Sequence, residues 1–523
     1  MILIPAPLRF VLTTALAFTI ALPLAAQRPG GGEGSEGDSA SGAPRSPLAG
    51  LKFRELGPAT TSGRISDIAI HQSDGSTWYV GAASGGIWKT TNAGTTWSAI
   101  FDSQASYAIG ALAIAPSDPL TVWAGTGENN SQRSVGYGDG VYRSADAGRS
   151  WKNMGLKNSA HIGGIAIHPT NSKTVYVAAQ GPLWSGGGER GVYKTTDGGI
   201  TWELILKGDS DWTGANEVHL DPRNPEVVYA VMWQRFRRQW GFINGGPGSG
   251  IHKSIDGGKT WTKLSSGLPS EELGKIGLAI SPADPNTIYA VVEASARGRG
   301  LYRSTDAGSS WRKMSSYNAG PPFYYHELTA DPNEVGRLYS VDVGLMMSAD
   351  SGNSFTGLPT RTKHVDHHAL WIDPDNTSHM ITGNDGGLYQ SFDRGATWQY
   401  SSNLPLTQFY KLAIDNSKPF YYVYGGTQDN NTLGGPSRTT ASRGITNDDW
   451  FVVTGGDGFQ PSVDPEEPNI VYGESQHGVL VRLDRKSGER VTFCCSSISP
   501  GDRKVISPPS RIAAISPRAF TMV

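Results

Sequence analysis

The chain has few cysteines, little charge and no helical periodicity beyond its first 26 residues. Its only two cysteines, Cys494 and Cys495, are adjacent, so they suit neither a relaxed disulfide nor a metal site. Charged residues make up 18% of the sequence, and 45 Lys and Arg nearly balance 47 Asp and Glu. No net field attracts nucleic acid or an anionic membrane, and packing has to stabilise the protein.

Glycine and aromatic residues are abundant. Glycine accounts for 67 of the 523 residues, nearly twice its usual share of about 7%, and Trp, Tyr and Phe together account for 10%. Short stretches with apolar residues at alternate positions lie between clusters of Gly, Pro, Asn and Asp. This composition predicts an all-β protein with many turns.

The N-terminus has a pattern typical of export. Residues 1–26 combine one Arg, an apolar run from Phe10 to Leu24 and a final pair of alanines, which predicts a signal peptide. The run is short for a membrane span, and an uncleaved anchor is the alternative. Residues 27–50 are rich in Gly and Ser and predict a flexible linker. We expect a secreted, periplasmic or cell-surface protein without a further membrane segment.

An eight-residue phrase, close to S/T-x-D-x-G-x-T/S-W, occurs in seven variants. Its third position is occupied by Asn92, Asp146, Asp197, Asp256, Asp306, Asp350 and Asp393. The intervals run from 43 residues, between Asp350 and Asp393, to 59 residues, between Asp197 and Asp256. In a hairpin turn, Asp can accept backbone N–H bonds, Gly can adopt a positive φ, and the Trp ring can be buried. We therefore assign these seven residues a structural role.

A second pattern precedes most copies of the phrase, as in IGLAISPADPNTIYAV (276–291). Two β-rich runs joined by a Pro/Asp/Asn turn predict a hairpin, so each repeat supplies four strands. The repeat length suits a propeller blade, and closing such sheets into a ring removes most exposed edges. The sequence therefore predicts a β-propeller, with residues 51–400 forming its blades.

These patterns resemble a known family. The phrase is similar to the Asp-box, or BNR repeat, and residues 63–97 resemble xyloglucanase-type glycoside hydrolases, sortilin N-terminal domains and photosystem II assembly-factor propellers. Residues 425–437 and 448–484 resemble large secreted bacterial proteins of the sortilin or glycosyl-hydrolase-like type. The resemblance covers about residues 51–490.

The end of the chain leaves the number of rings open. Residues 401–490 contain two further strand patterns without an Asp-box. They predict the start of a second propeller after a seven-bladed ring, or else blades of one ring of about ten. Residues 491–523 lack any alternating pattern, and we interpret them as an irregular tail, either a truncated or frame-shifted product or a natural end.

A propeller commonly binds ligands where its innermost strands begin, at the mouth of the channel. Aligning the repeats places the following polar side chains there: Arg64, His161, Asn216, His326, His367 and His368. The run TKHVDHHAL (362–370) could ligate zinc through its imidazoles, but His and Asp also suit a solvated strand start. We predict no metal and no cofactor.

Hydrolysis of a glycosidic bond needs two carboxyl groups, and weak candidates for convergence across the ring are Glu217, Glu327 and Asp366. The resemblance implies a catalytic Asp in a T-D-x-G-G phrase of the first blade, but this chain has Ala83 at that position. Asp385 in GNDGG and Asp457 in GGDGF are interpreted as acceptors in glycine-rich turns.

Aromatic residues offer a platform for sugars or a peptide strand. The candidates are Trp233 and Trp240 in the segment 232–250, and Tyr324 and Tyr325 near the expected mouth. The alternative is a long loop that folds a small core of its own. We predict an exported sortilin-like protein that binds a protein, peptide or polysaccharide ligand. The alternative is a glycoside hydrolase acting on a β-glucan such as xyloglucan.

Overall fold

The computed structural model describes residues 54, 56 and 60–493. The expected signal peptide, the linker and the tail from residue 494 onward lie outside the described residues. The chain divides into two compact units, Met1–Glu55 and Leu56–Val523, and all strands of the described part belong to the second. Among the described residues, no helix has the length and apolar character that a membrane crossing requires.

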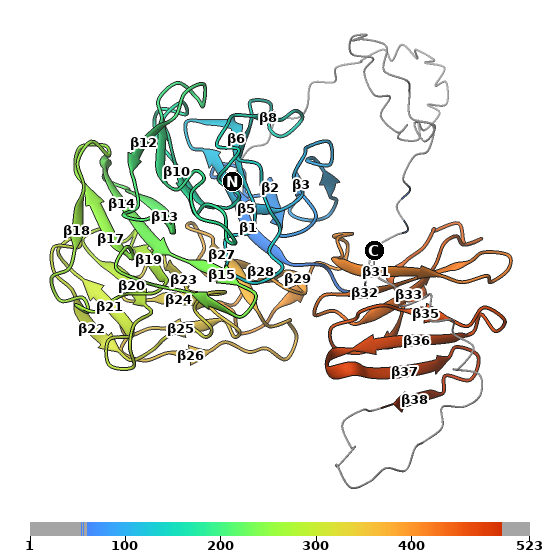
Figure 1. Cartoon of the computed structure of the whole chain (residues 1–523). Coiled ribbons are helices and arrows are strands. Elements are labelled where there is room, and N and C mark those ends of the chain that lie inside the picture. The colour runs from blue at the N-terminus through green and yellow to red at the C-terminus, as the bar shows by residue number, and fades with distance from the viewer. Residues whose placement is uncertain (1–53, 55, 57–59, 494–523) are drawn as a thin grey trace, which may run out of the picture. The chain divides into compact units, whose positions relative to one another are not determined.

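The described residues form nine four-stranded antiparallel sheets and one small hairpin (Figure 1). The first four sheets, which we call blades 1 to 4, contain β1 (Ile65–Ile70), β2 (Trp78–Ala82), β3 (Ile87–Thr90), β4 (Ser98–Ala99); β5 (Ile109–Ala115), β6 (Asp118–Thr126), β7 (Val141–Ser144), β8 (Lys152–Asn153); β9 (Ile162–Ile167), β10 (Val175–Ala179), β11 (Gly191–Thr195), β12 (Glu203–Leu206); and β13 (Thr213–Asp221), β14 (Asn224–Gln234), β17 (Gly250–Ser254), β18 (Thr262–Leu264). The hairpin consists of β15 (Phe236–Arg238) and β16 (Gly241–Ile243).

Three more blades and two further sheets follow. They contain β19 (Ile276–Ile280), β20 (Ile288–Val292), β21 (Gly300–Ser304), β22 (Arg312–Ser315); β23 (Glu327–Ala330), β24 (Leu338–Val341), β25 (Met346–Ser348), β26 (Thr356–Gly357); β27 (His367–Ile372), β28 (Met380–Asn384), β29 (Gly387–Ser391), β30 (Gln399–Tyr400); β31 (Phe409–Ile414), β32 (Tyr422–Thr427), β33 (Thr432–Pro436), β34 (Phe451–Thr454); and β35 (Ser462–Val463), β36 (Ile470–Ser475), β37 (Val479–Asp484), β38 (Arg490–Phe493). Two 3-10 turns, η1 (Asn447–Asp449) and η2 (Gln476–Gly478), lie in the last two sheets.

Blade 1 packs against blade 7, so seven blades close into a ring. Ile65 and Ile68 on β1 share a buried cluster with Ala369 and Ile381 of blade 7. The approach is close, because a Cβ at Gly383 would lie 2.5 Å from a methyl carbon of Ile65. The predicted all-β propeller is confirmed, and its ring has seven blades rather than about ten.

The turn phrase forms the hydrogen bonds, backbone conformation and ring contact that its residues predict. Asp146 accepts hydrogen bonds from the Ser144 hydroxyl at 2.7 Å and from the backbone N–H and hydroxyl of Ser150 at 2.9 and 2.6 Å. Gly148 has a φ of 88°, which favours glycine. The Trp151 ring packs edge-on against Phe101 of blade 1 at 5.2 Å. The phrase therefore fixes a hairpin and pins it to the preceding blade.

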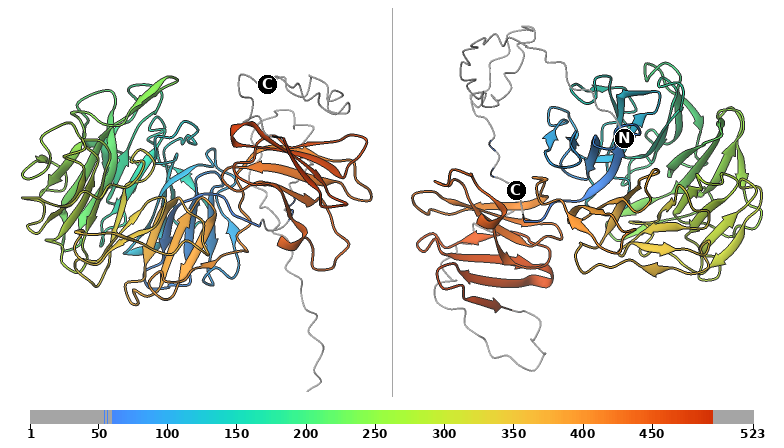
Figure 2. Two further views of the ribbon diagram at one scale, coloured as in Figure 1. Left: turned by 90° about the horizontal axis from the view of Figure 1, so that it is seen from below. Right: turned by 180° about the vertical axis from the view of Figure 1, so that it is seen from behind.

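The two sheets after the ring pack on each other through a separate core of Tyr424, Val453, Val471 and Leu483 (Figure 2). The first of them is bonded to the ring, because the side-chain amide of Asn430 donates to the carbonyl oxygens of Ser62 at 3.1 Å and Asp385 at 2.7 Å. That these sheets begin a second propeller stays a prediction.

Removing one turn carboxylate should weaken the fold measurably. We expect Asp146→Ala to lower the free energy of unfolding by about 1 kcal/mol, since three local hydrogen bonds at a solvated turn are lost. Urea unfolding of the purified chain measures the change. Asp375→Ala is the matched control, because that exposed side chain makes no hydrogen bond in the described structure. Equal stability of the two variants would contradict the assigned role.

Candidate functional site

The six polar residues expected at the channel mouth do come to the starts of the inner strands, but they are buried. Their exposed fractions are 8% or less: Arg64, His161, Asn216, His326, His367 and His368. Two of the imidazoles join neighbouring blades, because the Nδ1 of His161 bonds the carbonyl of Glu128 and that of His326 bonds the carbonyl of Lys275. Their role in contacting a ligand stays a prediction that this burial does not support.

Loops from three parts of the ring interlock above these strand starts. Residues 127–140 follow β6, residues 235–249 follow β14, and residues 316–326 precede β23. The backbone N–H of Ser131 donates to the carbonyl of Phe323 at 3.0 Å, and the guanidinium groups of Arg235 and Arg237 donate to the carbonyls of Asn130 and Ser131. The protein's own loops therefore occupy the place where a ligand was expected.

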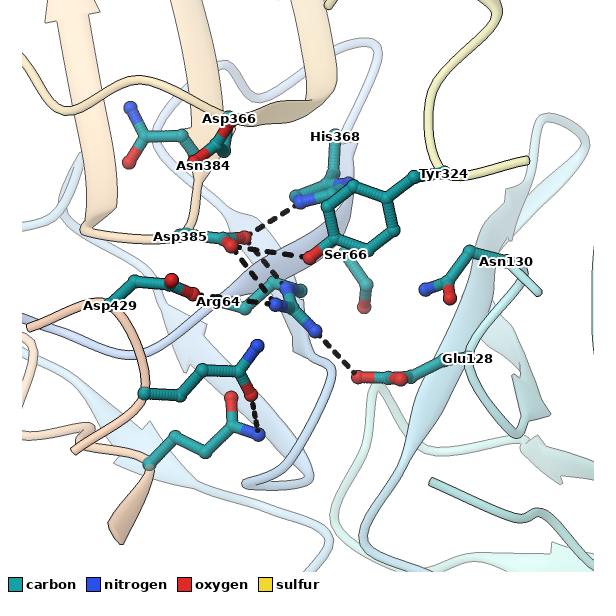
Figure 3. Close-up of polar contacts among 12 residues, drawn as sticks. Arg64, Ser66, Glu128, Asn130, Tyr324, Asp366, His368, Asn384, Asp385 and Asp429 are labelled. Carbon is teal, nitrogen blue, oxygen red and sulfur yellow. Dashed lines mark hydrogen bonds and ion pairs between the residues drawn. The ribbon is translucent and has the colours of Figure 1, made fainter. Parts of the chain in front are cut away.

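A group of charged and polar side chains connects the ring with the first sheet beyond it (Figure 3). We call it the Arg64 cluster, and it consists of Arg64, Glu128, Tyr324, His368, Asp385 and Asp429. Arg64 makes a two-point ion pair with Asp385, at 2.6 and 2.9 Å, and reaches Glu128 at 3.2 Å and Asp429 at 3.7 Å. Asp385 also accepts from His368 at 2.7 Å.

Two carboxyl groups of the Arg64 cluster, those of Asp385 and Asp429, prefer opposite protonation states. Burial alone would raise the pKa of Asp385, but Arg64 and His368 hold it well below its usual range. Burial and the nearby charge of Asp385 raise the pKa of Asp429 to about 8. At neutral pH Asp385 is therefore ionised while Asp429 keeps its proton, which is the pairing that acid–base chemistry requires.

Asp429 faces a partly open surface that Asp457 and two aromatic rings share. The side chain of Asp429 is 29% exposed, and Asp457 accepts the Asp429 backbone N–H at 2.6 Å and the Gln476 amide at 2.9 Å. Tyr410 and Phe459 stack with ring centres 5.8 Å apart and planes 16° from parallel. Burial and the nearby charges of Asp457 and Asp429 raise the pKa of Tyr410. We call Tyr410, Asp429, Asp457 and Phe459 the junction site.

Sequence reasoning found only part of this arrangement. Asp385 and Asp457 are acceptors in glycine-rich turns, as interpreted, but Asp385 is also the centre of an ion-pair network. Asp429 and Tyr410 were missed. The usable signal was the polar turn TQDNN (427–431), where Asp429 and Asn431 have positive φ values of 59° and 75°.

The three weak catalytic candidates do not converge. Glu217 and Glu327 line one cavity of about 240 Å³ in the centre of the ring, together with Asp67. Asp366 is not among the residues lining that cavity, and its carboxylate accepts the hydroxyl of Tyr325 instead. Catalytic roles for these residues stay predictions, and at most two of the three face a common space.

Four imidazole nitrogens of the histidine run bond to other groups of the protein. His367 bonds Thr382 through Nδ1 and Lys363 through Nε2, while His368 bonds Asp385. In the part of the chain that the structure describes, no group of three or more His, Cys, Asp or Glu side chains is arranged to hold a metal ion.

The aromatic candidates have different environments. Trp233 is 1% exposed, and its indole N–H donates to the carbonyl of Asn244 at 3.1 Å, so it belongs to the interior. Trp240 is 85% exposed on the β15–β16 hairpin. Tyr325 is buried, with an exposed fraction of 5%, and the ring of Tyr324 lies against the Arg64 guanidinium. Trp240 is the one member of the four that is freely accessible.

The described residues define an all-β propeller, and comparisons with known proteins give its relatives. No family model matches the chain. A probable oligoxyloglucan-reducing end-specific xyloglucanase of Neosartorya fischeri is 25% identical over 210 residues, 34% of this chain and 23% of that protein. A xyloglucanase of Hypocrea jecorina is 28% identical over 231 residues, 39% of this chain and 26% of that protein. The matches thus span about a quarter of the length of these relatives.

Two solved structures have the same fold over most of the chain. The GH74 enzyme of Niastella koreensis superposes with a TM-score of 0.61 at 18% identity, covering 85% of this chain and 68% of that one. The GH74 xyloglucanase of Xanthomonas campestris superposes with a TM-score of 0.56 at 15% identity, covering 84% and 74%. The two sequence relatives are both named as xyloglucanases.

Breaking the central ion pair should destabilise the chain strongly. We expect Asp385→Asn to lower the free energy of unfolding by about 3–5 kcal/mol, because Arg64, which is 5% exposed, loses its two-point partner. Chemical denaturation measures this loss. The control is Asp366→Asn, at the end of the same blade, which keeps an oxygen to accept the Tyr325 hydroxyl. If both variants lost a similar free energy of unfolding, the ion pair of Asp385 with Arg64 would not contribute more to stability than the contact of Asp366.

Proposed function

We propose that this chain hydrolyses a β-glucan such as xyloglucan, and that the junction site carries the acid–base groups. The observation on which the proposal rests is that the Asp457 carboxylate accepts the backbone N–H of Asp429, whose own side chain is 29% exposed. The partly exposed rings of Tyr410 and Phe459 stack on each other in the same sheet region. Carboxyl pairs are the common machinery of glycosidic bond hydrolysis. The activity in the names of the two curated relatives supports the choice of substrate.

Asp429 is the proposed general acid. Its raised pKa of about 8, caused by burial and by the charge of Asp385, keeps a proton available at neutral pH. Its partly exposed side chain can reach the leaving-group oxygen of a bound sugar. Asp385 itself is not a candidate for proton transfer, since Arg64, His368 and Tyr324 already occupy its oxygens.

Asp457 is the proposed second carboxyl group. The backbone N–H of Asp429 and the amide of Gln476 fix its orientation with one hydrogen bond to each oxygen. A carboxylate held in this way can act as a base toward water on the opposite side of the sugar ring, or as a nucleophile, depending on the separation of the two groups when substrate is bound.

Tyr410 and Phe459 are the proposed stacking surface for the sugar. They are 38% and 37% exposed, and their near-parallel rings offer a flat apolar face beside the carboxyl groups. In the first blade, Ala83 stands where the resemblance implied an Asp, and it is fully buried. The proposed acid–base pair therefore does not use the first-blade position at which the resemblance implied a catalytic Asp.

A ligand-binding role without hydrolysis is the second candidate, and the exposed Trp240 favours it. An accessible indole at the tip of a hairpin suits capture of a polysaccharide chain. Under this alternative the junction site holds a glycan without cleaving it.

Replacing the proposed acid should abolish hydrolysis. We expect the purified chain to release reducing sugar from xyloglucan and Asp429→Asn to release at least about 100-fold less, since general acid catalysis contributes about 10²–10⁴-fold. For the unchanged chain, the rate should fall as pH rises through about 8, because the proton that Asp429 donates is then lost. Initial rates between pH 5 and pH 9.5 measure both effects.

Asp375→Asn is the control for the charge change, since this exposed carboxylate lies on blade 7, outside the junction site. No release from xyloglucan, mixed-linkage glucan, chitin or sialylated glycans by folded protein would overturn the hydrolase proposal. Full activity of Asp429→Asn would instead move the acid to another residue.

The stacking surface should govern substrate affinity more than the chemical step. We expect Tyr410→Ala to raise KM for xyloglucan about 10-fold with a smaller change in kcat, because one sugar-stacking face of about 1–3 kcal/mol is removed. Steady-state kinetics separate the two parameters. Tyr421→Ala is the control, since that ring is 46% exposed in the same sheet. Unchanged KM in Tyr410→Ala would exclude the ring from the substrate path.

A further inference from the structure

The segment that leads from the β15–β16 hairpin to β17 contains a reactive pair of residues. Residues 244–250 read NGGPGSG, and Asn244–Gly245 is the one Asn-Gly pair in the sequence. In such a pair, the backbone nitrogen of the glycine can attack the side-chain carbonyl carbon of the asparagine, because glycine has no Cβ to obstruct the approach and its backbone is permissive. The surroundings of the two residues decide whether the reaction proceeds in the folded chain.

The attacking nitrogen, that of Gly245, carries no hydrogen bond. The neighbouring N–H of Gly246 donates to the carbonyl of Leu273 at 3.0 Å, but among the described residues the N–H of Gly245 has no acceptor. The position is also closed to other residue types, since a Cβ at Gly245 would lie 2.6 Å from the carbonyl oxygen of Leu273. The fold therefore requires glycine here and leaves its nitrogen unpaired.

The side chain of Asn244 contacts a carboxyl group through its nitrogen alone. Its Nδ2 donates to the Oε2 of Glu293, while its Oδ1 is buried and has no hydrogen-bond partner in the described structure. Glu293 is fixed in turn, because its Oε2 accepts the backbone N–H of Lys275 at 2.9 Å and its own N–H donates to the Lys275 carbonyl at 3.0 Å. The nitrogen that would leave in the reaction is thus held against a carboxyl group.

The environment of Glu293 favours its protonated form. Burial raises the pKa of its carboxyl group, although the hydrogen bonds from Lys275 and Asn244 and the charge of Lys275 oppose the shift. The other carboxyl group that lines the same cavity is that of Glu272, which is exposed. A larger fraction of Glu293 therefore carries a proton near neutral pH than for a glutamate in water.

Water can reach these groups. A cavity of about 290 Å³ is lined by Asn244, Gly245 and Glu293, with Glu272 and four further residues. Asn244, Gly245 and Glu293 are all partly exposed. The attacking nitrogen, the amide, the carboxyl group and a source of water therefore share one cavity.

We propose that Asn244 is a site of deamidation assisted by the chain itself, with Glu293 as the proton donor. The nitrogen of Gly245 loses its proton to hydroxide and bonds to the Cγ of Asn244. The bond from Cγ to Nδ2 then breaks, and Nδ2 leaves as ammonia with the proton of Glu293. One water molecule opens the resulting five-membered imide at either carbonyl, which gives aspartate or isoaspartate, and Glu293 recovers its proton from water.

The modification changes the contacts of the segment. The product has a carboxylate beside the carboxyl group of Glu293, in place of an amide that donates to it. Isoaspartate also adds a methylene group to the backbone next to the carbonyl that accepts the indole N–H of Trp233 at 3.1 Å. Because Trp233 is 1% exposed, a slow and irreversible reaction at the surface reaches the interior of the ring.

Peptide mapping of the whole purified chain tests the proposal. After incubation at neutral pH, trypsin releases residues 239–253, and deamidation changes the mass of this peptide by the difference between an amide and a carboxyl group. We expect the modified fraction to rise with time. Glu293→Gln should slow the rise at least about 10-fold, a lower bound on the about 10²–10⁴-fold that general acid catalysis contributes.

Glu272→Gln is the matched control, because this exposed carboxyl group lines the same cavity and makes no hydrogen bond to Asn244 in the described structure. It should react at the rate of the unchanged chain. Circular dichroism checks that Glu293→Gln is folded, and we expect that it is, since the new side chain keeps an oxygen for the N–H of Lys275.

The pH dependence of the unchanged chain gives a second test that needs no variant. The rate should level off once Glu293 ionises, because the supply of protonated acid then falls as fast as the nitrogen of Gly245 loses its proton. In the isolated peptide 239–253, which lacks Glu293, the rate should continue to rise with pH.

Three results would overturn the proposal. They are an unmodified Asn244 in the folded chain under conditions in which the isolated peptide reacts, equal rates in folded Glu293→Gln and the unchanged chain, and a pH profile of the chain that rises like that of the peptide. The test is independent of hydrolysis at the junction site, because it measures the mass of the chain and not the release of sugar.

Discussion

The ion pair between Arg64 and Asp385 is the interaction on which the rest of the structure depends. Arg64 precedes the first strand of blade 1 and Asp385 follows the second strand of blade 7, so one two-point contact joins the ends of the ring. Around it, His368 and Tyr324 complete the coordination of Asp385, and Asn430 bonds the backbone beside both partners. Ring closure and attachment of the following sheet therefore share one buried electrostatic centre.

That centre also sets the chemistry of its neighbours. The charge that Arg64 fixes on Asp385 is one of the reasons why Asp429 holds its proton, so the acidic group on the open surface depends on an ionised group beneath it. A low-dielectric interior makes such coupling stronger than it would be in water. Structure and reactivity are consequently linked at this junction, because the same residue that holds the ring together tunes the proposed acid.

The repeat pattern was sufficient to predict the all-β propeller, because the turn chemistry is local. Asp146 contacts residues two and four positions away, and such contacts can be read from eight consecutive letters. The site was harder to predict, since it depends on loops of different length. Trp233 and Trp240 lie seven positions apart in one segment, yet one is interior and the other exposed. Likewise Glu327 and Asp366 both stand near inner strand starts, but Asp366 is turned to Tyr325.

The sequence separation of the closing pair has a consequence for synthesis on the ribosome. Arg64 and Asp385 are 321 positions apart, whereas the strands within a blade are neighbours along the chain. At about 5–20 residues per second, translating that interval takes about 16–64 s. During this time each blade can form as it emerges, while the first blade has an open flank and Arg64 has no counter-ion from blade 7. The nascent chain therefore passes through a prolonged open-ring stage in which a chaperone or the ribosome surface has time to act.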